Sequence, residues 1–363
     1  MKKRSLLMLS MADPLTDRRA QNFKRLFEGA GWIVELLAPT TNAKRGPRRF
    51  IEYHQNLKRM IAGYSADVVL ACDLYSLSAT RRMKQHGKSQ LLLYDAREVY
   101  TELPTVARKP LSKLFWKWVE RRGLAATDVL LTTGPRDIQA ICDVHSFLPR
   151  PVLVRNLPWR ALDLRGDRRL LKPYGIPSDA KVLVYVGGLQ EGRGLEILLK
   201  ALSLLPPTIV HVLLIGDGIL RPQLERNRSE LGIESIVHFA GALPSDEALR
   251  LAAACDVGLS LIEPISRSYE LALPSKLFEY MMCGIPVVSS RLEQVTDLFE
   301  KEGWITFVDV SDPNSIQKGI EAALANAQHP ALRERLRSLA LSEYHFEHDA
   351  AKLLTLLDTL LPG

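Results

Sequence analysis

The stretch RSYELALPSKLFEYMMCGIPVVSS, residues 267–290, decides how the rest of the sequence is interpreted. Within it, Pro274 fixes φ directly before a run of apolar residues at helical spacing, the order in which a helix begins. Gly284 is expected to end that helix, because glycine readily adopts the left-handed conformation found at a helix C-terminus. The β-branched pair Val287 and Val288 then predicts a short buried strand.

The start of this helix has the chemistry of a phosphate site. A helix start presents unpaired N–H groups and a partial positive charge, and here those groups belong to Ser275, Lys276 and Leu277. Glu279 follows one turn later on the same side of the helix, where a carboxylate accepts hydrogen bonds from two adjacent ribose hydroxyls. The pattern therefore suits a nucleotide diphosphate. An ordinary amphipathic helix with a solvated Glu279 remains the alternative on the local pattern alone.

Length and composition set the scale of the protein. A chain of 363 residues with 47% hydrophobic and 25% charged residues is globular and long enough for two domains. The opening MKKRSLLMLSMADP becomes polar too soon for a secretory signal, and no apolar run reaches the roughly 18 residues of a membrane span, so we expect a cytoplasmic protein. The cysteines lie far apart without C-x-x-C spacing, which indicates neither a disulfide framework nor a zinc site: Cys72, Cys142, Cys255 and Cys283.

Positive charge is concentrated in the first part of the chain. Residues 1–150 hold 26 Lys and Arg against 14 Asp and Glu, a surplus of +12, whereas the remainder holds 22 against 27. Such a surplus indicates a polyanionic partner. Aromatic interleaving is weak and nucleic-acid motifs are missing, so the sequence favours an anionic membrane surface over nucleic acid.

A helix expected over residues 111–123 allows two interpretations. Its apolar stripe is formed by Leu111, Leu114, Phe115 and Trp118, with basic residues on another face. In a doubly wound domain this stripe is expected to pack on the sheet. The alternative places the helix in a membrane interface. Both interpretations hold if Leu114 and Trp118 pack on the sheet while Trp116 contacts lipid headgroups.

Strand and helix patterns alternate through both halves of the chain, which predicts two parallel sheets covered by helices. Strands are expected first at residues 6–8, 33–37, 67–71, 90–94, 128–132 and 151–154, and after a hinge at 156–160 the pattern restarts at 181–186. The predicted fold class is therefore α/β with two Rossmann-like domains. We place them at residues 1–156 and 157–345, with a last segment, 346–363, forming a helix.

Glycines follow the strand at 181–186 and again suggest a phosphate site. Gly187, Gly188, Gly192 and Gly194 let the backbone close on a diphosphate, and Arg193 adds a guanidinium. Neither this cluster nor Gly216-Asp-Gly218 has the G-x-G-x-x-G spacing of a dinucleotide fingerprint, so NAD binding is not favoured.

The segment LPSKLFEYMMCGIPVV, residues 273–288, resembles the donor site of retaining GT-B glycosyltransferases of the large group 1 family. The resemblance implies two domains facing across a cleft, helix amides on the diphosphate of a nucleotide sugar, and Glu279 on its ribose. It also implies that the loop 187–194 contacts the diphosphate through Arg193, that Gly216 turns beside the nucleotide, and that Gly241 lies near the base. A C-terminal helix that crosses back to the first domain is implied as well.

Three positions depart from the family pattern, and one of them is Gly188, which stands where the family often has a first basic residue. The family's first motif carboxylate falls at Leu271, with Glu270 one residue away. In YDAREVYTELP, residues 94–104, which resembles the family segment at the inter-domain cleft, Arg97 replaces a His that contacts the donor sugar. Arg97 is expected either to hold a phosphate or acidic group of a substrate, or to act as a structural clamp with Glu98 or Glu102.

The function expected from these features is hexosyl transfer with retention, from a UDP- or GDP-linked sugar to a sugar or lipid-linked acceptor, in polysaccharide or glycolipid synthesis of the cell envelope. The location expected is the cytoplasm, or the inner face of the cytoplasmic membrane as a peripheral protein. No cofactor is expected, and no metal either, because no D-x-D pair ends a strand near the diphosphate. The alternatives are a degenerate GT-B binding subunit and a 2-epimerase-like enzyme, and the oligomeric state is left open. The candidate catalytic residues are Arg193, Lys276, Glu270 and Arg97; the candidate nucleotide-binding residues are Gly187, Gly188, Gly192, Ser275, Leu277, Glu279, Gly216 and Gly241.

Overall fold

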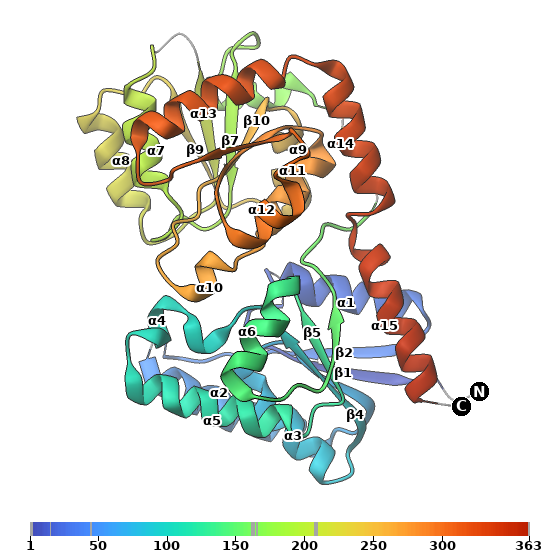
Figure 1. The fold of residues 1–363 in the computed structure, drawn as a ribbon. Helices are drawn as coiled ribbons and strands as arrows, with labels where there is room; N and C mark the ends of the chain where they lie inside the picture. Colours follow the sequence, from blue (N-terminus) through green and yellow to red (C-terminus); the bar gives the residue numbers. More distant parts are fainter. Residues whose placement is uncertain are drawn as a thin grey trace. The chain divides into compact units, whose positions relative to one another are not determined.

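The computed structural model describes residues 3–14, 16–43, 46–160, 164, 166–206 and 210–361. The chain divides into two compact units, each built around one six-stranded parallel sheet (Figure 1). Unit 1 comprises Met1–Asn156, Ser266–Ser268 and Phe346–Gly363, and unit 2 comprises Leu157–Ile265 and Tyr269–His345. The predicted fold class, α/β with two Rossmann-like domains, is confirmed.

The sheet of unit 1 has the strand order β2-β1-β3-β4-β5-β6, with every neighbouring pair parallel. The order reverses beside β1, so the carboxyl ends of β1 and its neighbours are where a doubly wound sheet binds ligands. The elements are β1 (Ser5–Leu9), α1 (Arg18–Gly29), β2 (Ile33–Leu37), α2 (Gly46–Met60), β3 (Ala66–Ala71), α3 (Leu74–Gln85), β4 (Ser89–Ala96), α4 (Pro104–Ala107), α5 (Pro110–Leu124), β5 (Val129–Thr132), α6 (Pro135–His145) and β6 (Arg150–Leu153), with 3₁₀ turns at Ile61–Gly63 and Tyr100–Glu102.

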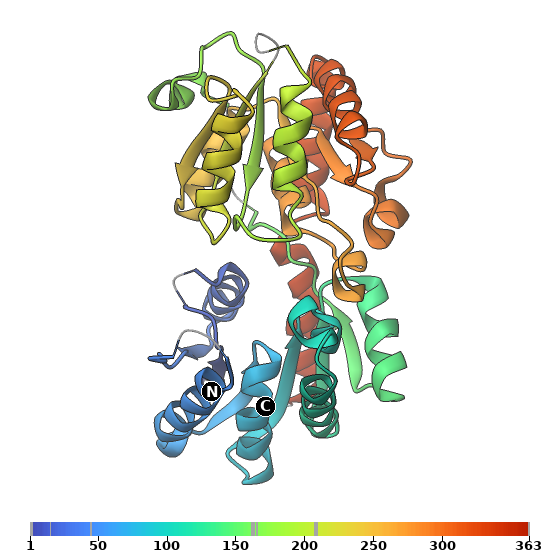
Figure 2. The ribbon, with the colours of Figure 1, turned by 90° about the vertical axis from the view of Figure 1, so that its left-hand side faces the viewer.

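Helices α2, α3 and α5 lie side by side in unit 1, as Figure 2 shows. Trp116 of α5 locks them together, since its ring packs edge-on against Phe50 and Tyr75 with centroids 5.1 Å away in each case. This aromatic contact fixes which side of α5 faces inward.

The structure contradicts the interpretation in which the apolar stripe of α5 packs on the sheet. The buried stripe is Trp116, Val119, Glu120, Gly123 and Leu124, while Leu111, Leu114, Phe115 and Trp118 are exposed. Glu120 is accommodated inside because the Tyr94 hydroxyl donates to one of its oxygens at 2.7 Å and His145 Nε2 lies 2.9 Å from the other. A buried carboxylate with two partners thus takes the place that an apolar stripe was expected to fill.

Unit 2 has the strand order β12-β11-β10-β7-β8-β9, again parallel throughout. Its elements are β7 (Val182–Val186), α7 (Leu195–Ser203), β8 (His211–Ile215), α8 (Arg221–Glu230), β9 (Val237–Gly241), α9 (Ser245–Ala253), β10 (Val257–Ser260), α11 (Ser275–Cys283), β11 (Val287–Ser290), α12 (Glu293–Phe299), β12 (Ile305–Val308), α13 (Pro313–Asn326) and α14 (Pro330–Ser342), with a 3₁₀ segment at Arg168–Tyr174. The helix predicted from Ser275 to Gly284 and the strand after it are both present.

The last helix, α15 (Phe346–Leu360), belongs to unit 1, although the residues before it belong to unit 2. The Phe346 ring packs edge-on against Phe23 of α1 at 5.1 Å. Asp349 accepts hydrogen bonds from the backbone N–H and the guanidinium of Arg155 at 2.7–2.9 Å. Phe346 and Asp349 therefore fasten α15 to the first unit.

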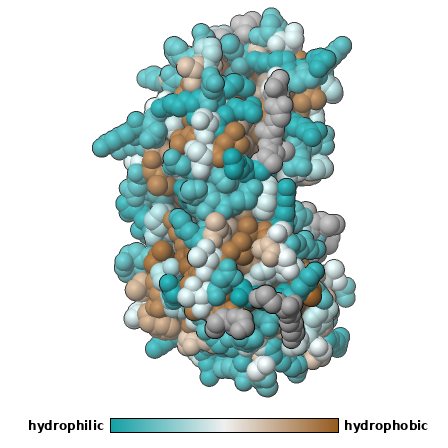
Figure 3. Space-filling model, turned by 90° about the vertical axis from the view of Figure 1, so that its right-hand side faces the viewer, coloured by the Kyte–Doolittle hydropathy of each residue, from teal (hydrophilic) through white to brown (hydrophobic). Residues whose placement is uncertain are grey.

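Hydrophilic residues cover most of the face drawn in Figure 3, with hydrophobic residues in patches between them. This is the distribution expected when the apolar sides of helices are turned toward the sheets. In the part of the chain that the structure describes, no helix combines the length and apolar character that crossing a membrane requires.

Asp349→Ala should lower the free energy of unfolding by about 3 kcal/mol, because it leaves the half-buried Arg155 guanidinium without its carboxylate. Asp358→Ala is the matched control on the same helix, since Asp358 pairs with Arg4 at an exposed position and should change stability by no more than about 1 kcal/mol. Urea denaturation at pH 7 measures both. Equal losses in the two variants would contradict the anchoring role of Asp349.

Candidate nucleotide site and a buried ion cluster

Three of the predicted glycines lie together at the carboxyl ends of β7, β8 and β9. Gly187 and Gly216 have φ of 146° and 145°, and a Cβ on Gly216 would stand only 1.9 Å from the carbonyl oxygen of Gly187. The N–H of Gly216 also donates to the carbonyl of Gly241 at 2.8 Å. Glycine is required where these two turns touch, because any side chain at Gly216 would separate them.

The next glycines shape the loop that carries Arg193. Gly192 and Gly194 have φ of 77° and 66°, and Glu263 secures both, since its N–H donates to Gly192 O and its Oε1 accepts from Gly194 N–H, each at 3.0 Å. The Arg193 guanidinium lies over the Tyr269 ring at 5.1 Å from its centroid. The loop therefore holds a cation in a fixed, half-buried position.

Helix α11 begins at the predicted residue. Pro274 precedes it in an extended conformation, and Gly284 ends it with φ of 73°. The N–H of Leu277 donates to the Pro274 carbonyl at 3.2 Å, so the N–H groups of Ser275 and Lys276 are the ones that precede the helix's own hydrogen bonds. The predicted phosphate contacts of Ser275, Lys276 and Leu277 stay predictions, with the Leu277 N–H already donating within the chain.

Lys276 is buried beside these elements. Its Nζ lies 4.0 Å from the centroid of the Tyr185 ring, and a Cβ on Gly187 would lie 3.4 Å from the same nitrogen. Burial and repulsion from Arg193 lower the pKa of Lys276 to about 7, against an opposing contribution from Glu279. Two crowded cations next to a helix start favour an anionic ligand, because a bound anion would relieve both penalties.

The two motif carboxylates differ in their surroundings. Glu279 is buried on α11, close enough to Lys276 to raise the pKa of that amine. Glu270 ends the short helix α10 (Arg267–Glu270) and is half-buried, and the next residue, Leu271, is buried with its carbonyl accepting a hydrogen bond from Gln294. The structure therefore brings Glu279 together with Lys276, Arg193 and the glycine turns. At the position where the family pattern has a carboxylate, this chain has the buried Leu271.

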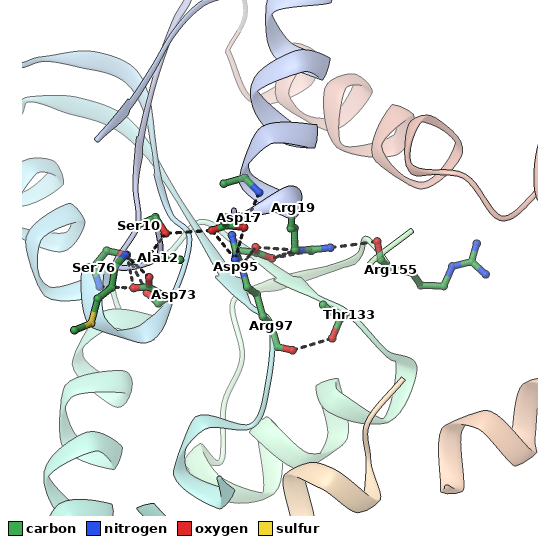
Figure 4. Close-up of polar contacts among 12 residues, drawn as sticks. Ser10, Ala12, Asp17, Arg19, Asp73, Ser76, Asp95, Arg97, Thr133 and Arg155 are labelled. Carbon is green, nitrogen blue, oxygen red and sulfur yellow. Dashed lines mark hydrogen bonds and ion pairs between the residues drawn. The ribbon is translucent and has the colours of Figure 1, made fainter. Parts of the chain in front are cut away.

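A second constellation lies in unit 1, at the carboxyl ends of β1 and β4 (Figure 4). Asp95 accepts hydrogen bonds from Arg19 at 2.7–3.0 Å and from Arg97 Nε at 2.8 Å. Asp17 accepts from Arg97 Nη1 at 2.8 Å and also caps α1 through the N–H of Ala20. Two guanidinium groups and two carboxylates thus form a closed ion cluster.

The electrostatics agree with a clamp. Burial alone would raise the pKa of Asp95, but Arg19 and Arg97 lower it below the ordinary value. Burial would lower the pKa of Arg97, but Asp95 and Asp17 raise it well above the ordinary value. Of the two roles expected for Arg97, the clamp is the one the contacts support, although the expected partners, Glu98 and Glu102, are wrong: Glu102 pairs with Lys113 at 2.7 Å instead.

One nitrogen of the Arg97 guanidinium takes no part in the ion cluster. This nitrogen, Nη2, is buried and has no hydrogen-bond partner among the residues that the structure describes, which is costly for a guanidinium nitrogen. A substrate oxygen that reached this nitrogen would complete its hydrogen bonding, so the expected substrate contact of Arg97 remains a prediction for this atom.

Several contributing residues were not expected from the sequence. Tyr185, Tyr269 and Glu263 shape the nucleotide site, and Asp17 and Arg19 complete the ion cluster. The aromatic signal was available, because Tyr185 interrupts the aliphatic run of β7 just before the glycines. Among the described residues, no group of three or more His, Cys, Asp and Glu side chains is arranged to hold a metal ion.

These two six-stranded parallel-sheet units have the architecture of the GT-B fold. Residues 180–326 match the family model described as "Glycosyl transferases group 1", which confirms the predicted resemblance over this segment.

The curated relatives include two proteins of Rhizobium meliloti (strain 1021). The "lipopolysaccharide core biosynthesis glycosyltransferase LpsE" is 31% identical over 183 residues, which is 50% of this chain and 51% of that protein. The similarly named LpsD is 27% identical over 293 residues, 77% of this chain and 70% of that protein. The matched segment thus spans about half the length of LpsE.

Solved structures share the fold at low identity. Sucrose-phosphate synthase from Thermosynechococcus elongatus aligns with a TM-score of 0.80 and 18% identity, over 99% of both chains. Anabaena HepE in complex with UDP aligns with a TM-score of 0.73 and 16% identity, over 98% of this chain and 100% of that one. At these identities the likeness establishes the fold.

Arg97→Ala should lower the free energy of unfolding by about 3 kcal/mol, because it leaves the buried Asp17 carboxylate without its cation and removes one of the two guanidinium partners of Asp95. Lys113→Ala, which breaks the more exposed pair with Glu102, should cost no more than about 1 kcal/mol. Urea denaturation followed by tryptophan fluorescence compares the two. If Arg97→Ala were as stable as Lys113→Ala, the cluster would not be a clamp.

Proposed function

We propose that the protein is a glycosyltransferase that moves a hexosyl group from a UDP- or GDP-linked sugar to an acceptor hydroxyl with retention of configuration. One observation carries the proposal: the start of α11, the buried Lys276 and the loop cation Arg193 converge beside the touching glycine turns of unit 2. This arrangement fits a diphosphate, and Glu279 on the same helix fits its ribose. Retention rests on the family resemblance.

The proposed chemistry requires stabilisation of a leaving diphosphate. As the bond from sugar to phosphate breaks, negative charge grows on the diphosphate oxygens. The N–H groups of Ser275 and Lys276 and the side chains of Lys276 and Arg193 supply positive charge at that place, so we propose transfer without a metal ion or other cofactor. The UDP complex of the structurally similar Anabaena HepE supports UDP as the nucleotide to test first.

The proposed acceptor is a sugar or lipid-linked glycan of the cell envelope. Two relatives named for lipopolysaccharide core biosynthesis support this class, and so does the surplus of +12 in residues 1–150. We place the enzyme in the cytoplasm, peripherally on the inner face of the cytoplasmic membrane, where such an acceptor would be presented.

A degenerate GT-B subunit that binds without turnover is the second candidate. It is favoured by the buried Leu271 at the position of a family carboxylate and by the confinement of Arg97 in an ion cluster. Such a subunit would bind the nucleotide sugar but release no nucleotide when an acceptor is supplied.

A panel of UDP-, GDP-, ADP- and dTDP-sugars should raise the melting temperature of the protein with one nucleotide, because a ligand of the folded state stabilises it by mass action. Glu279→Ala should then weaken binding of that nucleotide sugar by about 1.5–3 kcal/mol, the range for hydrogen bonds to a charged group, with inorganic phosphate hardly affected. Glu321→Ala, at an exposed position of α13, is the control. Unchanged affinity in Glu279→Ala would remove the ribose from this position.

Binding of the nucleotide sugar should also be linked to a proton. With the pKa of Lys276 lowered to about 7, the amine is largely neutral at pH 8 and becomes protonated when a diphosphate arrives. Affinity should therefore fall as pH rises from 7 to 9, by up to about tenfold per unit, and rise by no more than about twofold from pH 7 down to 6. Calorimetry at pH 8 in buffers of different ionisation enthalpy should show uptake of up to one proton.

Lys276→Met is the matched variant for this linkage, because it keeps the length of the side chain without the titrating group. It should bind more weakly and with no proton uptake at pH 8. Identical heats in all buffers for the unaltered protein would show that Lys276 does not change its protonation on binding.

A further inference from the structure

A groove in unit 1 lies away from both constellations described above. It has a volume of about 230 Å³ and lies between α2, α3 and α5. Its lining combines the cations Lys58 and Arg82 with the aromatic rings of Phe115 and Trp118. No Asp or Glu is among the described residues that line it, so it presents positive charge next to apolar surface.

The exposed stripe of α5 runs along this groove. Leu111, Leu114, Phe115 and Trp118 are 84%, 67%, 53% and 54% exposed, whereas their neighbour Trp116 is 6% exposed. Because Trp116 fixes the helix to α2 and α3 through Phe50 and Tyr75, the stripe is presented on a rigid support. Four large apolar side chains on successive turns form a patch, which marks an interaction surface rather than scattered exposure.

Further cations border the stripe. The Arg122 guanidinium lies over the Trp118 ring at 4.7 Å, and burial together with repulsion from Arg122 and Arg82 lowers the pKa of Arg81. Such crowding of three arginines is unfavourable unless a polyanion relieves it. At the other end of the stripe Lys113 is already paired with Glu102.

The charge and the shape of the groove and the α5 stripe indicate which kind of partner binds there. A second copy of this chain would bring like charge to like charge, because a two-fold interface pairs a patch with itself. Nucleic acid would leave Leu111 and Leu114 in water, since bases stack on aromatic rings rather than on leucines. A bilayer interface accommodates all three features, because aromatic rings lie at headgroup depth, leucines enter the acyl boundary and cations meet phosphates.

We propose that the groove and the α5 stripe together bind an anionic phospholipid of a membrane surface, with Lys58 and Arg82 on its phosphate and Phe115 and Trp118 beside its acyl chains. The lipid site deepens the membrane placement proposed above, and its use by the enzyme rests on that placement. It lies wholly in unit 1 and needs no contribution from the nucleotide site.

Co-sedimentation with vesicles of phosphatidylglycerol and phosphatidylcholine tests the site, with pure phosphatidylcholine as the neutral surface. Binding should require the anionic lipid and weaken as salt is added. Lys58→Glu with Arg82→Glu should reduce it at least about tenfold, as should Phe115→Ser with Trp118→Ser, which leaves the net charge unchanged. Lys200→Glu with Arg226→Glu, at exposed positions of α7 and α8 in unit 2, is the charge-matched control and should bind nearly as well as the unaltered protein.

The outcomes separate the alternatives. Equal recovery with anionic and neutral vesicles would overturn the proposal, and so would an equal loss in the control, which would indicate unspecific adhesion. Competition by millimolar inorganic phosphate alone would identify a free-phosphate site instead, and a concentration-dependent dimer abolished by the Phe115 and Trp118 changes would identify a second copy as the occupant. Melting temperatures confirm that each variant folds.

The nucleotide panel distinguishes this failure from failure of the proposed function. If the unaltered protein does not bind anionic vesicles while a nucleotide still raises its melting temperature, the lipid site alone is overturned. Vesicle binding without any nucleotide effect would leave the lipid site standing and remove the glycosyltransferase proposal.

Discussion

The hydroxyl of Tyr280 is the contact on which the arrangement of unit 2 depends. It accepts the N–H of Val186 at 3.0 Å and lies 3.2 Å and 3.3 Å from the carbonyls of Val184 and Leu259, so it ties α11 to β7 and β10 at once. Gly258 makes room for the ring, since a Cβ there would stand 2.3 Å from it. Because β7 runs directly into Gly187, this contact helps to fix α11 relative to the glycine turns.

The two charged constellations differ in how their charges are balanced. In unit 1 each arginine of the cluster meets a carboxylate, so Arg19, Arg97, Asp17 and Asp95 largely neutralise one another. In unit 2, Lys276 and Arg193 repel each other, and Glu279 offsets only part of the effect on the lysine. A closed cluster contributes to the stability of its fold, whereas an unbalanced pair of cations contributes affinity for an anion.

The features that the sequence predicted correctly are those that depend on residues close together in the chain. The start of α11, its end at Gly284, the glycine turns and the alternation of strands and helices all follow from backbone preferences within a few residues, and the structure contains them. The partners of Arg97 and the inward face of α5 depend on residues far away in sequence. Asp17 lies 80 positions before Arg97, and Glu120 is acceptable inside only because Tyr94 and His145 meet it there.

The burial of Lys276 connects the stability of unit 2 to its proposed chemistry. Withdrawing an amine from water disfavours its charged form, and the lowered pKa records that cost. A folded state that carried an aliphatic side chain here would avoid the cost, so the lysine is unfavourable for the fold by itself. A bound diphosphate reverses the balance, because in a site of low polarity its charge interacts with the ammonium more strongly than in water. Lys276 thus lowers the stability of the fold without a ligand, and it contributes affinity when the proposed diphosphate binds.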